Sequence, residues 1–124
     1  THLQKINVVE EFLISRIKPG KTDALVAQAL NIIYQSKGQI KIGALSDQLH
    51  ISPSPLEKRF RRVVGASPKK FASIVRFKHI IRNGASAPSL TALGYDAGFY
   101  DQAHFIKEFK KFTGDTPENY FASE

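Results

Sequence analysis

The chain has no cysteine and no methionine among its 124 residues. The lack of cysteine excludes a disulfide framework, a thiolate nucleophile and a cysteine-based zinc site. Four histidines are present, but they are scattered without the spacing of metal ligands: His2, His50, His79 and His104. The sequence also lacks a nucleophile elbow and a glycine-rich phosphate loop. We therefore expect neither an enzyme nor a protein that holds a metal or another cofactor.

A long hydrophobic run is also missing. No apolar stretch approaches the roughly 20 residues of a transmembrane helix, and no signal-peptide pattern opens the chain. We therefore expect a cytoplasmic protein. Because a nascent chain begins with methionine, the start at Thr1 suggests a trimmed end. We expect a longer parent protein in which a ligand-sensing or dimerisation domain precedes Thr1.

The composition is strongly basic. The chain carries 18 lysine and arginine residues against 11 aspartate and glutamate residues, which gives a net charge of +7 and a pI near 9.8. This balance favours a polyanionic partner such as nucleic acid or an anionic membrane surface. Charge alone does not decide the partner, because many basic proteins bind neither. The hydrophobic fraction of 42% is enough for one or two small cores in one domain.

Residues 98–117 are the most informative stretch, because their apolar and cationic residues fall on opposite faces of one predicted helix. At roughly 100° per residue, Phe105, Phe109 and Phe112 share a narrow stripe. The opposite face carries Ala103, Lys107, Lys110 and Lys111. Residues 52–68 repeat this plan, with a stripe and opposing cations as follows: Leu56, Phe60 and Val63 against Lys58, Arg61 and Arg62.

The two stretches match in register. Apolar, cationic and turn positions pair at one constant offset: Phe60 with Phe109, Lys58 with Lys107, Gly65 with Gly114, and Pro68 with Pro117. A shared packing plan would not require the cationic positions to repeat, because solvated helix faces tolerate any polar residue. The duplication therefore indicates two copies of a binding surface.

The remaining segments give the order of the predicted elements. Residues 1–20 form a connector helix that leads towards the missing domain and ends at Pro19-Gly20. Residues 21–124 form one domain, whose parts are a helix after Thr22-Asp23, motif one at 42–65, a linker helix at 68–83 and motif two at 89–114. In each motif a short helix, a turn and a cationic helix follow one another, and motif two has one extra turn residue beside Gly98. A last short helix starts at Thr116-Pro117.

Motif two contains a specific spacing of residues: Gly98, Phe99, Asp101, Phe105, Phe109, Lys110, Gly114, Pro117 and Tyr120. This spacing resembles the signature of the AraC/XylS family of bacterial transcription regulators, and the resemblance extends over residues 23–121. It implies an all-α domain of seven helices in which one long linker helix joins two helix-turn-helix motifs. It also implies a sequence-specific regulator, which we expect to be an activator, with double-stranded DNA and RNA polymerase as partners. The two cationic helices would enter successive major-groove segments.

Carried over by position, the resemblance implies base contacts from both motifs: Ser54, Glu57 and Lys58 in motif one, and Gln102, Ala103, His104 and Lys107 in motif two. These residue types suit base edges, because glutamine pairs with adenine, lysine with guanine, glutamate with cytosine N4, and an alanine methyl touches thymine. For His104 the alternative is a merely exposed side chain. We assign phosphate contacts, which position the protein without specifying sequence, to Arg61, Arg62, Lys110 and Lys111.

Several positions depart from the family pattern. Ser46 and Gly94 stand where alanine is usual, and we expect Gly94 to cost about 1 kcal/mol in helix propensity. Ile80 is larger than the residue expected in the linker helix, and Phe121 replaces a terminal arginine that would contact phosphate. Arg76 is either structural or phosphate-facing, and the sequence does not choose between these roles.

Pro55 leaves two possible starts for the cationic helix of motif one. Ser52 could cap the helix with Pro53 at its first position, or Ser54 could cap it with Pro55 there. The second start forms a capping box between Ser54 and Glu57, which engages both side chains with backbone N–H groups. On that hypothesis motif one mainly contributes charge, and motif two carries most of the sequence specificity.

Two other classes of function stay open. A nonspecific architectural or RNA-binding module would also present two basic helices, and it would bind any sequence with a steep salt dependence. Alternatively, the family module could be attached to an enzyme of the DNA-alkyl-transfer type. The absence of cysteine excludes the thiolate of that chemistry from this segment.

Overall fold

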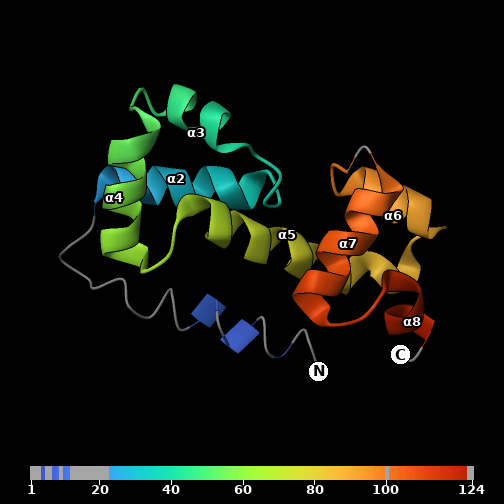
Figure 1. The fold of residues 1–124 in the computed structure, drawn as a ribbon. Helices are drawn as coiled ribbons and strands as arrows, with labels where there is room; N and C mark the ends of the chain where they lie inside the picture. The colour runs from blue at the N-terminus through green and yellow to red at the C-terminus, as the bar shows by residue number, and fades with distance from the viewer. Residues whose placement is uncertain (1–3, 5–6, 9, 12–22, 100, 123–124) are drawn as a thin grey trace.

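The computed structural model describes residues 4, 7–8, 10–11, 23–99 and 101–122, and every regular element among them is helical (Figure 1). Seven α-helices follow one another between residues 23 and 122: α2 (Ala24–Gln35), α3 (Ile42–Gln48), α4 (Pro53–Val64), α5 (Pro68–Asn83), α6 (Leu90–Asp96), α7 (Gln102–Thr113) and α8 (Pro117–Ala122). A 3-10 turn, η1 (Gly84–Ser86), follows α5 directly. The predicted all-α class with seven helices is therefore confirmed.

The predicted connector helix over residues 1–20 lies largely outside the described residues. The five residues that are described there are all helical: Gln4, Asn7, Val8, Glu10 and Glu11. Glu10 is only 7% exposed, and its Oε1 accepts a hydrogen bond from Lys78 Nζ of α5 at 2.6 Å. Nowhere in the described ranges is a helix both long and apolar enough to cross a membrane.

The helices begin where the sequence supplies a capping side chain. Asp23 is the N-cap residue of α2. Ser67 Oγ accepts a hydrogen bond from Lys70 N at 3.1 Å, and Asp101 Oδ1 accepts one from Ala103 N at 2.9 Å. Each cap satisfies an N–H group that the first turn of a helix leaves unpaired. The linker helix α5 therefore covers residues 68–83 as predicted, and α7 starts behind the predicted cap.

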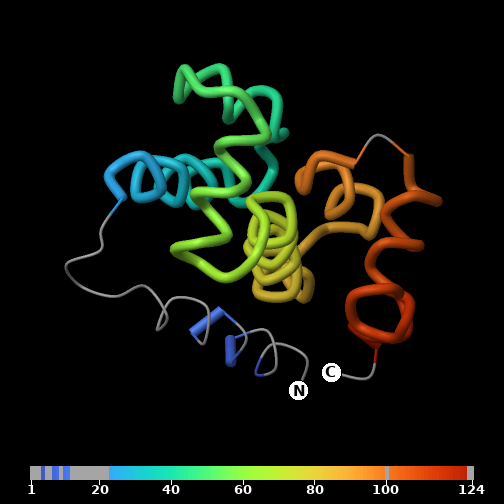
Figure 2. The backbone as a smooth tube through the Cα atoms, turned by 60° about the vertical axis from the view of Figure 1, so that its left-hand side comes forward, coloured from blue at the N-terminus to red at the C-terminus, as the bar shows by residue number. Residues whose placement is uncertain are grey.

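The linker helix α5 joins two groups of helices. Figure 1 shows α2, α3 and α4 at one end of the molecule and α6, α7 and α8 at the other. Figure 2, turned about the vertical axis, shows the same two groups on either side of α5. With 16 residues, α5 extends over about 24 Å. The helix is therefore long enough to contact both groups of helices.

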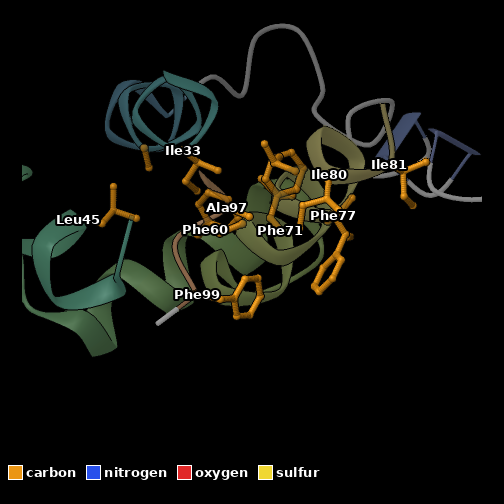
Figure 3. Packing of buried hydrophobic residues seen from close by; sticks show 14 of the residues in the cluster. Ile33, Leu45, Phe60, Phe71, Phe77, Ile80, Ile81, Ala97 and Phe99 are labelled. Carbon is orange, nitrogen blue, oxygen red and sulfur yellow. The ribbon is translucent and has the colours of Figure 1, made fainter. Parts of the chain in front are cut away.

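Two aromatic residues of α5 lie in one hydrophobic cluster but pack against different motifs (Figure 3). Phe71 lies edge-on to Phe60 of α4, with the ring centroids 6.0 Å apart. Phe77 instead stacks on Phe112 of α7, with centroids 4.6 Å apart and an angle of 12° between the ring planes. Phe109 of α7 adds an edge-on contact to Phe77 at 6.2 Å. Because each buried phenylalanine contributes on the order of 1.5–3 kcal/mol, both motifs are held to the same helix.

The predicted apolar stripes are confirmed, with half-buried residues at their C-terminal ends. Four stripe residues are fully buried: Leu56, Phe60, Phe105 and Phe109. Val63 is half-buried and packs against the core, while the neighbouring Val64 is fully buried. In α7, Phe112 is likewise half-buried against the core and Thr113 is buried. In both helices the fully buried residues therefore lie four apart, and one half-buried residue packs beside them.

Gly94 allows α6 and α7 to approach each other closely. A Cβ atom at Gly94 would lie 2.9 Å from Cδ2 of the buried Phe105 ring. The matching Ser46 of motif one is buried and donates its hydroxyl to the Gly43 carbonyl at 3.0 Å. The expected loss of helix propensity at Gly94 thus accompanies a close packing contact with Phe105 of α7.

The two remaining departures from the family pattern occupy packed positions. Ile80 is 1% exposed and belongs to the core. Phe121 is half-buried, with its ring against Gly84 at a distance that leaves no room for a Cβ atom there. The Phe121 ring also packs on Phe109, with centroids 5.8 Å apart. Phe121 therefore closes the C-terminal end of the core of motif two.

Candidate nucleic-acid interface

The first cationic helix, α4, begins at Pro53 with Ser52 as its N-cap residue. This settles the choice of start that the sequence left open, and the capping box between Ser54 and Glu57 is not formed. Pro55 fits the third helical position, because the first turn leaves that N–H group unpaired in any case. Proline also offers no N–H at this position, and the Ser52 hydroxyl makes no side-chain cap bond. Ser54 and Glu57 are both exposed, and the capping box on which the hypothesis of a motif that mainly contributes charge depends is absent.

The two motifs share the turn that precedes the cationic helix. Its left-handed residue is His50, with φ 54°, in motif one and Gly98, with φ 88°, in motif two. In both copies the next N–H group returns to the short helix: Ile51 N to Ser46 O at 3.1 Å, and Phe99 N to Gly94 O at 2.9 Å. The extra residue predicted for motif two therefore follows Phe99, at position 100, which lies outside the described residues. The glycine supplies the positive φ without the cost that a side chain has there.

The predicted contact residues lie on the outer faces of α4 and α7, opposite the buried stripes. The exposed ones are Ser54, Glu57, Lys58, Arg61 and Arg62 in α4, and Ala103, His104, Lys107, Lys110 and Lys111 in α7. Gln102 is half-buried, and its Oε1 lies over Gly94. In Figure 1 and in Figure 2, α4 and α7 both run from the upper towards the lower part of the view, from their first to their last residue. The structure thus brings the residues of each set together on one solvent-facing surface.

Two of these residues have an acidic neighbour on their own helix. Arg61 Nε donates to Glu57 Oε1 at 3.0 Å, and both side chains are more than half exposed (58% and 51%). His104 Nε2 lies 3.8 Å from Glu108 Oε1, and the His104 ring lies edge-on to Phe99 with centroids 5.4 Å apart. Exposed pairs of this kind contribute about 0.5 kcal/mol or less. A phosphate or a base can therefore displace them at little cost.

The other cations of the two faces are not neutralised. Within the part of the chain that the structure describes, none of the following forms an ion pair with a carboxylate: Lys58, Arg62, Lys107, Lys110 and Lys111. Unpaired charge on two repeated faces creates a positive potential that attracts a polyanion.

Two contacts that the sequence did not indicate hold motif two against the rest of the chain. Gln39, in the loop before α3, donates from Nε2 to the Asp96 carbonyl at 2.7 Å. Arg76 Nε of α5 donates to the Ala97 carbonyl at 2.8 Å, and its guanidinium carbon lies 3.7 Å from the centre of the Phe99 ring. Burial lowers the pKa of Arg76, although an arginine in a protein stays protonated. We call these two contacts the inter-motif latch, and they favour the structural role for Arg76.

A bidentate ion pair ties the start of α2 to α4. Arg59 donates from Nη2 to Asp23 Oδ1 at 2.7 Å and from Nε to Asp23 Oδ2 at 2.8 Å. The hydrogen bond from Arg59 is the main reason that the pKa of Asp23 is lowered, and burial opposes it. The partners are 36 positions apart, so no local pattern in the sequence points to the pair.

Residues 45–123 match a family model described as a helix-turn-helix domain. Over 119 residues the chain is 29% identical to the Msm operon regulatory protein of Streptococcus mutans. The aligned region covers 91% of this chain and 42% of that protein. The fold is similar to the C-terminal domain of AraT, a response regulator from Geobacillus stearothermophilus, with a TM-score of 0.74, 20% identity and 88% of each chain covered. A "probable AraC family transcriptional regulator" from Rhodopseudomonas palustris is 27% identical, with a TM-score of 0.64 over 82% of this chain and 97% of its own. The chain spans less than half the length of the curated relatives it matches.

Proposed function

We propose that the chain, which belongs to the AraC family of helix-turn-helix transcription regulators, reads double-stranded DNA through α4 and α7. This family is non-enzymatic, so no reaction is assigned to the chain. One observation carries the proposal: two helices in the same register each present unpaired cations opposite a buried stripe. A packed core accounts for the stripes but not for the repeated cations.

The proposed base contacts come from the outer faces of the two recognition helices: Ser54, Glu57 and Lys58 of α4, and Gln102, Ala103, His104 and Lys107 of α7. Exposure supports these assignments, and Gln102 must swing away from Gly94 to reach a base. Because α4 starts at Pro53, Ser54 and Glu57 are not used in capping. We therefore expect both motifs to read bases.

The proposed phosphate contacts are Arg61, Arg62, Lys110 and Lys111, which lie in the last turns of α4 and α7. Their long side chains can reach the backbone on either side of a groove, where they fix position without reading sequence. Arg61 would exchange its exposed pair with Glu57 for a phosphate.

The two motifs are proposed to occupy successive major-groove segments, which lie about 34 Å apart on one face of DNA. One molecule would then read an asymmetric site of roughly two helical turns. The linker helix α5 and the inter-motif latch support this, because they hold the two recognition helices in one arrangement.

Properties of the whole protein are part of the proposal. One similar structure is a C-terminal domain of a response regulator, which supports a sensor or receiver domain before this segment in a cytoplasmic regulator. We further propose activation of transcription through contact with RNA polymerase. Run-off transcription can use a template that carries, upstream of a promoter, a DNA site selected for binding to the chain. Adding the chain should give more transcript, and less transcript would indicate a repressor.

Selection of bound duplexes from a random pool tests the central claim. We expect two blocks of preferred bases whose centres lie about one helical turn apart. If the pool stays random and every duplex competes equally, the chain is the nonspecific architectural module instead.

Two lysines of α7 separate base contacts from phosphate contacts. Replacing Lys107 by alanine should relax the preference at one base pair by about 1–3 kcal/mol, whereas replacing Lys111 should weaken all duplexes alike. Arg82→Ala, at the end of α5, removes an exposed cation elsewhere and serves as the control. The opposite pattern would exchange the roles of the two lysines.

A further inference from the structure

Two adjoining clefts lie between the motifs over α5. The larger has a volume of about 760 Å³ and is bordered by the loop before α3, by α5 and by the start of α7. The smaller has a volume of about 430 Å³ and is bordered by α5 and by the second half of α7. Lys69 and Ser73 of α5 line both clefts, so the two adjoin each other. We call them together the inter-motif trough, whose polar lining includes Lys41, Lys69, Lys70, Ser73, His104 and Lys111.

The trough is basic along both sides. Four exposed lysines line it and form no ion pair with a described carboxylate: Lys41, Lys69, Lys70 and Lys111. Two carboxylates, Asp101 and Glu108, also line it, and each already has a partner in α7. Asp101 caps the helix through Ala103 N, and Glu108 Oε1 lies 3.8 Å from His104 Nε2. The trough therefore carries net positive charge with no internal partner.

The floor of the trough offers little that could read a base. Phe77 and Phe112 are stacked at one end, and Phe99 lies under Arg76 at the other. The Ser73 hydroxyl donates to the carbonyl of Lys69 at 3.0 Å, so its donor is used within α5. An apolar floor with lysines along its edges suits a charged backbone, which needs ammonium groups and no specific pattern of donors and acceptors.

We infer that the inter-motif trough binds the sugar–phosphate backbone of the DNA between the two recognised major-groove segments. The inference rests on the proposed function, because His104 lines the trough and also belongs to the surface of α7 that meets the bases. A duplex held by α7 therefore passes over the trough on its way to α4. The family resemblance implies no DNA contact for Lys41, Lys69 or Lys70. In the trough these lysines add affinity that does not depend on the DNA sequence.

Charge removal tests the inference on the 124-residue chain. Lys41→Gln, Lys69→Gln and their double variant are compared with wild type on the selected duplex over a range of salt concentrations. Each lysine should contribute about 0.9 to the slope of log affinity against log salt, which corresponds to roughly eightfold in affinity at 0.1 M salt. The preferred bases should not change. Arg82→Gln, on the same helix but outside both clefts, should keep the wild-type slope.

The outcomes separate the trough from the proposed function. A double variant that retains the wild-type slope and affinity on a specific duplex overturns the trough and leaves the proposed function standing. If wild type shows no preferred sequence, the proposed function fails, and the trough inference fails with it because no recognised segments flank the trough.

Neutral DNA provides a second measurement. Methylphosphonates placed between the two blocks of the selected site remove the central phosphate charges. Wild type should lose affinity on this duplex, and the double variant should lose clearly less, since two of the four trough lysines are already missing. Equal losses for wild type and the double variant would show that these lysines do not face the central backbone.

Discussion

Gln39 Nε2 donates a hydrogen bond of 2.7 Å to the carbonyl oxygen of Asp96, and so joins residues that are 57 positions apart. The bond connects the loop before α3 with the end of α6. It lies beside the bond from Arg76 to Ala97, since the Gln39 and Arg76 side chains both approach Gly98. The linker helix joins the two motifs, and the latch further restricts their spacing and their rotation about that helix.

Replacing Gln39 by alanine should make the protein more tolerant of a changed distance between the two halves of its site. Wild type should lose affinity steeply when one base pair is inserted between the halves. The variant should lose roughly fivefold less, because one hydrogen bond contributes about 1 kcal/mol. Affinities on duplexes with and without the insertion provide the comparison. Gln28→Ala, an exposed glutamine of α2, is the control, and an identical penalty in all three proteins would show that the latch does not set the spacing.

Replacing Gly38 by alanine should destabilise the fold. Gly38 has φ 77°, and a Cβ atom there would lie 2.5 Å from Arg76 N, which belongs to the backbone of α5. The left-handed backbone and the overlap together should lower the free energy of unfolding by about 2–5 kcal/mol. Urea denaturation measures the change.

Gly43 supplies the matched control for this substitution. Nothing lies within 4 Å of a Cβ atom at Gly43, and the residue is in the first turn of α3. Gly43→Ala should therefore be neutral or stabilising by up to about 1 kcal/mol. Equal destabilisation by both substitutions would contradict the role given to the contact between Gly38 and α5.

The ion pair between Asp23 and Arg59 should make stability depend on pH in the acid range. The pKa of Asp23 is lower in the folded protein, so its contribution is complete above the unfolded value of about 3.9 and is lost as pH falls through the folded value. Asp23→Asn removes the charge but keeps a side chain that can cap α2. The melting temperature of wild type should exceed that of the variant at neutral pH, and the difference should vanish in acid.

Asp47→Asn tests whether this behaviour is specific to the pair. Asp47 is exposed and has no ion pair with any described residue, so its substitution should shift the melting temperature little at any pH. A difference between wild type and Asp23→Asn that persists well below the pKa of a carboxylic acid would assign the effect to capping rather than to charge.

The pair between Glu10 and Lys78 should respond differently to single and double substitution. The Glu10 and Lys78 side chains are 9% and 18% exposed, and Glu10 Oε2 is buried without a hydrogen-bond partner among the described residues. Lys78→Ala should therefore cost roughly 3 kcal/mol, because it leaves a buried carboxylate unpaired. The double variant Glu10→Gln with Lys78→Ala should recover part of this loss in chemical denaturation. Strictly additive effects would indicate that the two groups do not interact in solution.

Local chemistry explains why most of the fold could be predicted from the sequence. The cap at Ser67 and the turn after Asn83 define α5, and Asp101 defines the start of α7, because each acts on neighbours in the chain. The choice between Ser52 and Ser54 could not be made in this way, since each serine precedes a proline and both starts satisfy local rules. The structure shows which start the helix adopts, with Ser52 as the N-cap and Pro53 at the first helical position.

Contacts between distant residues could not be predicted. Gln39 with Asp96 and Arg59 with Asp23 have no spacing that a periodic pattern could reveal. The faces of the candidate site were predictable, because the repeat marks them directly. The trough was not, since Lys41 and Lys69 become neighbours only when α5 brings the loop before α3 close to α7.

The position of Phe71 and Phe77 on one helix has a consequence for how the chain folds and for where it can be cut. Phe71 completes the core of motif one with Phe60, and Phe77 completes that of motif two with Phe112. A cut in α5 before Phe71 or after Phe77 leaves one half without the phenylalanine on which it packs, and a cut between the two divides the helix that both halves share. Limited proteolysis or circular permutation that opens this helix should therefore destabilise both halves. The duplicated segment is a unit of recognition, and the unit of cooperative folding is the pair.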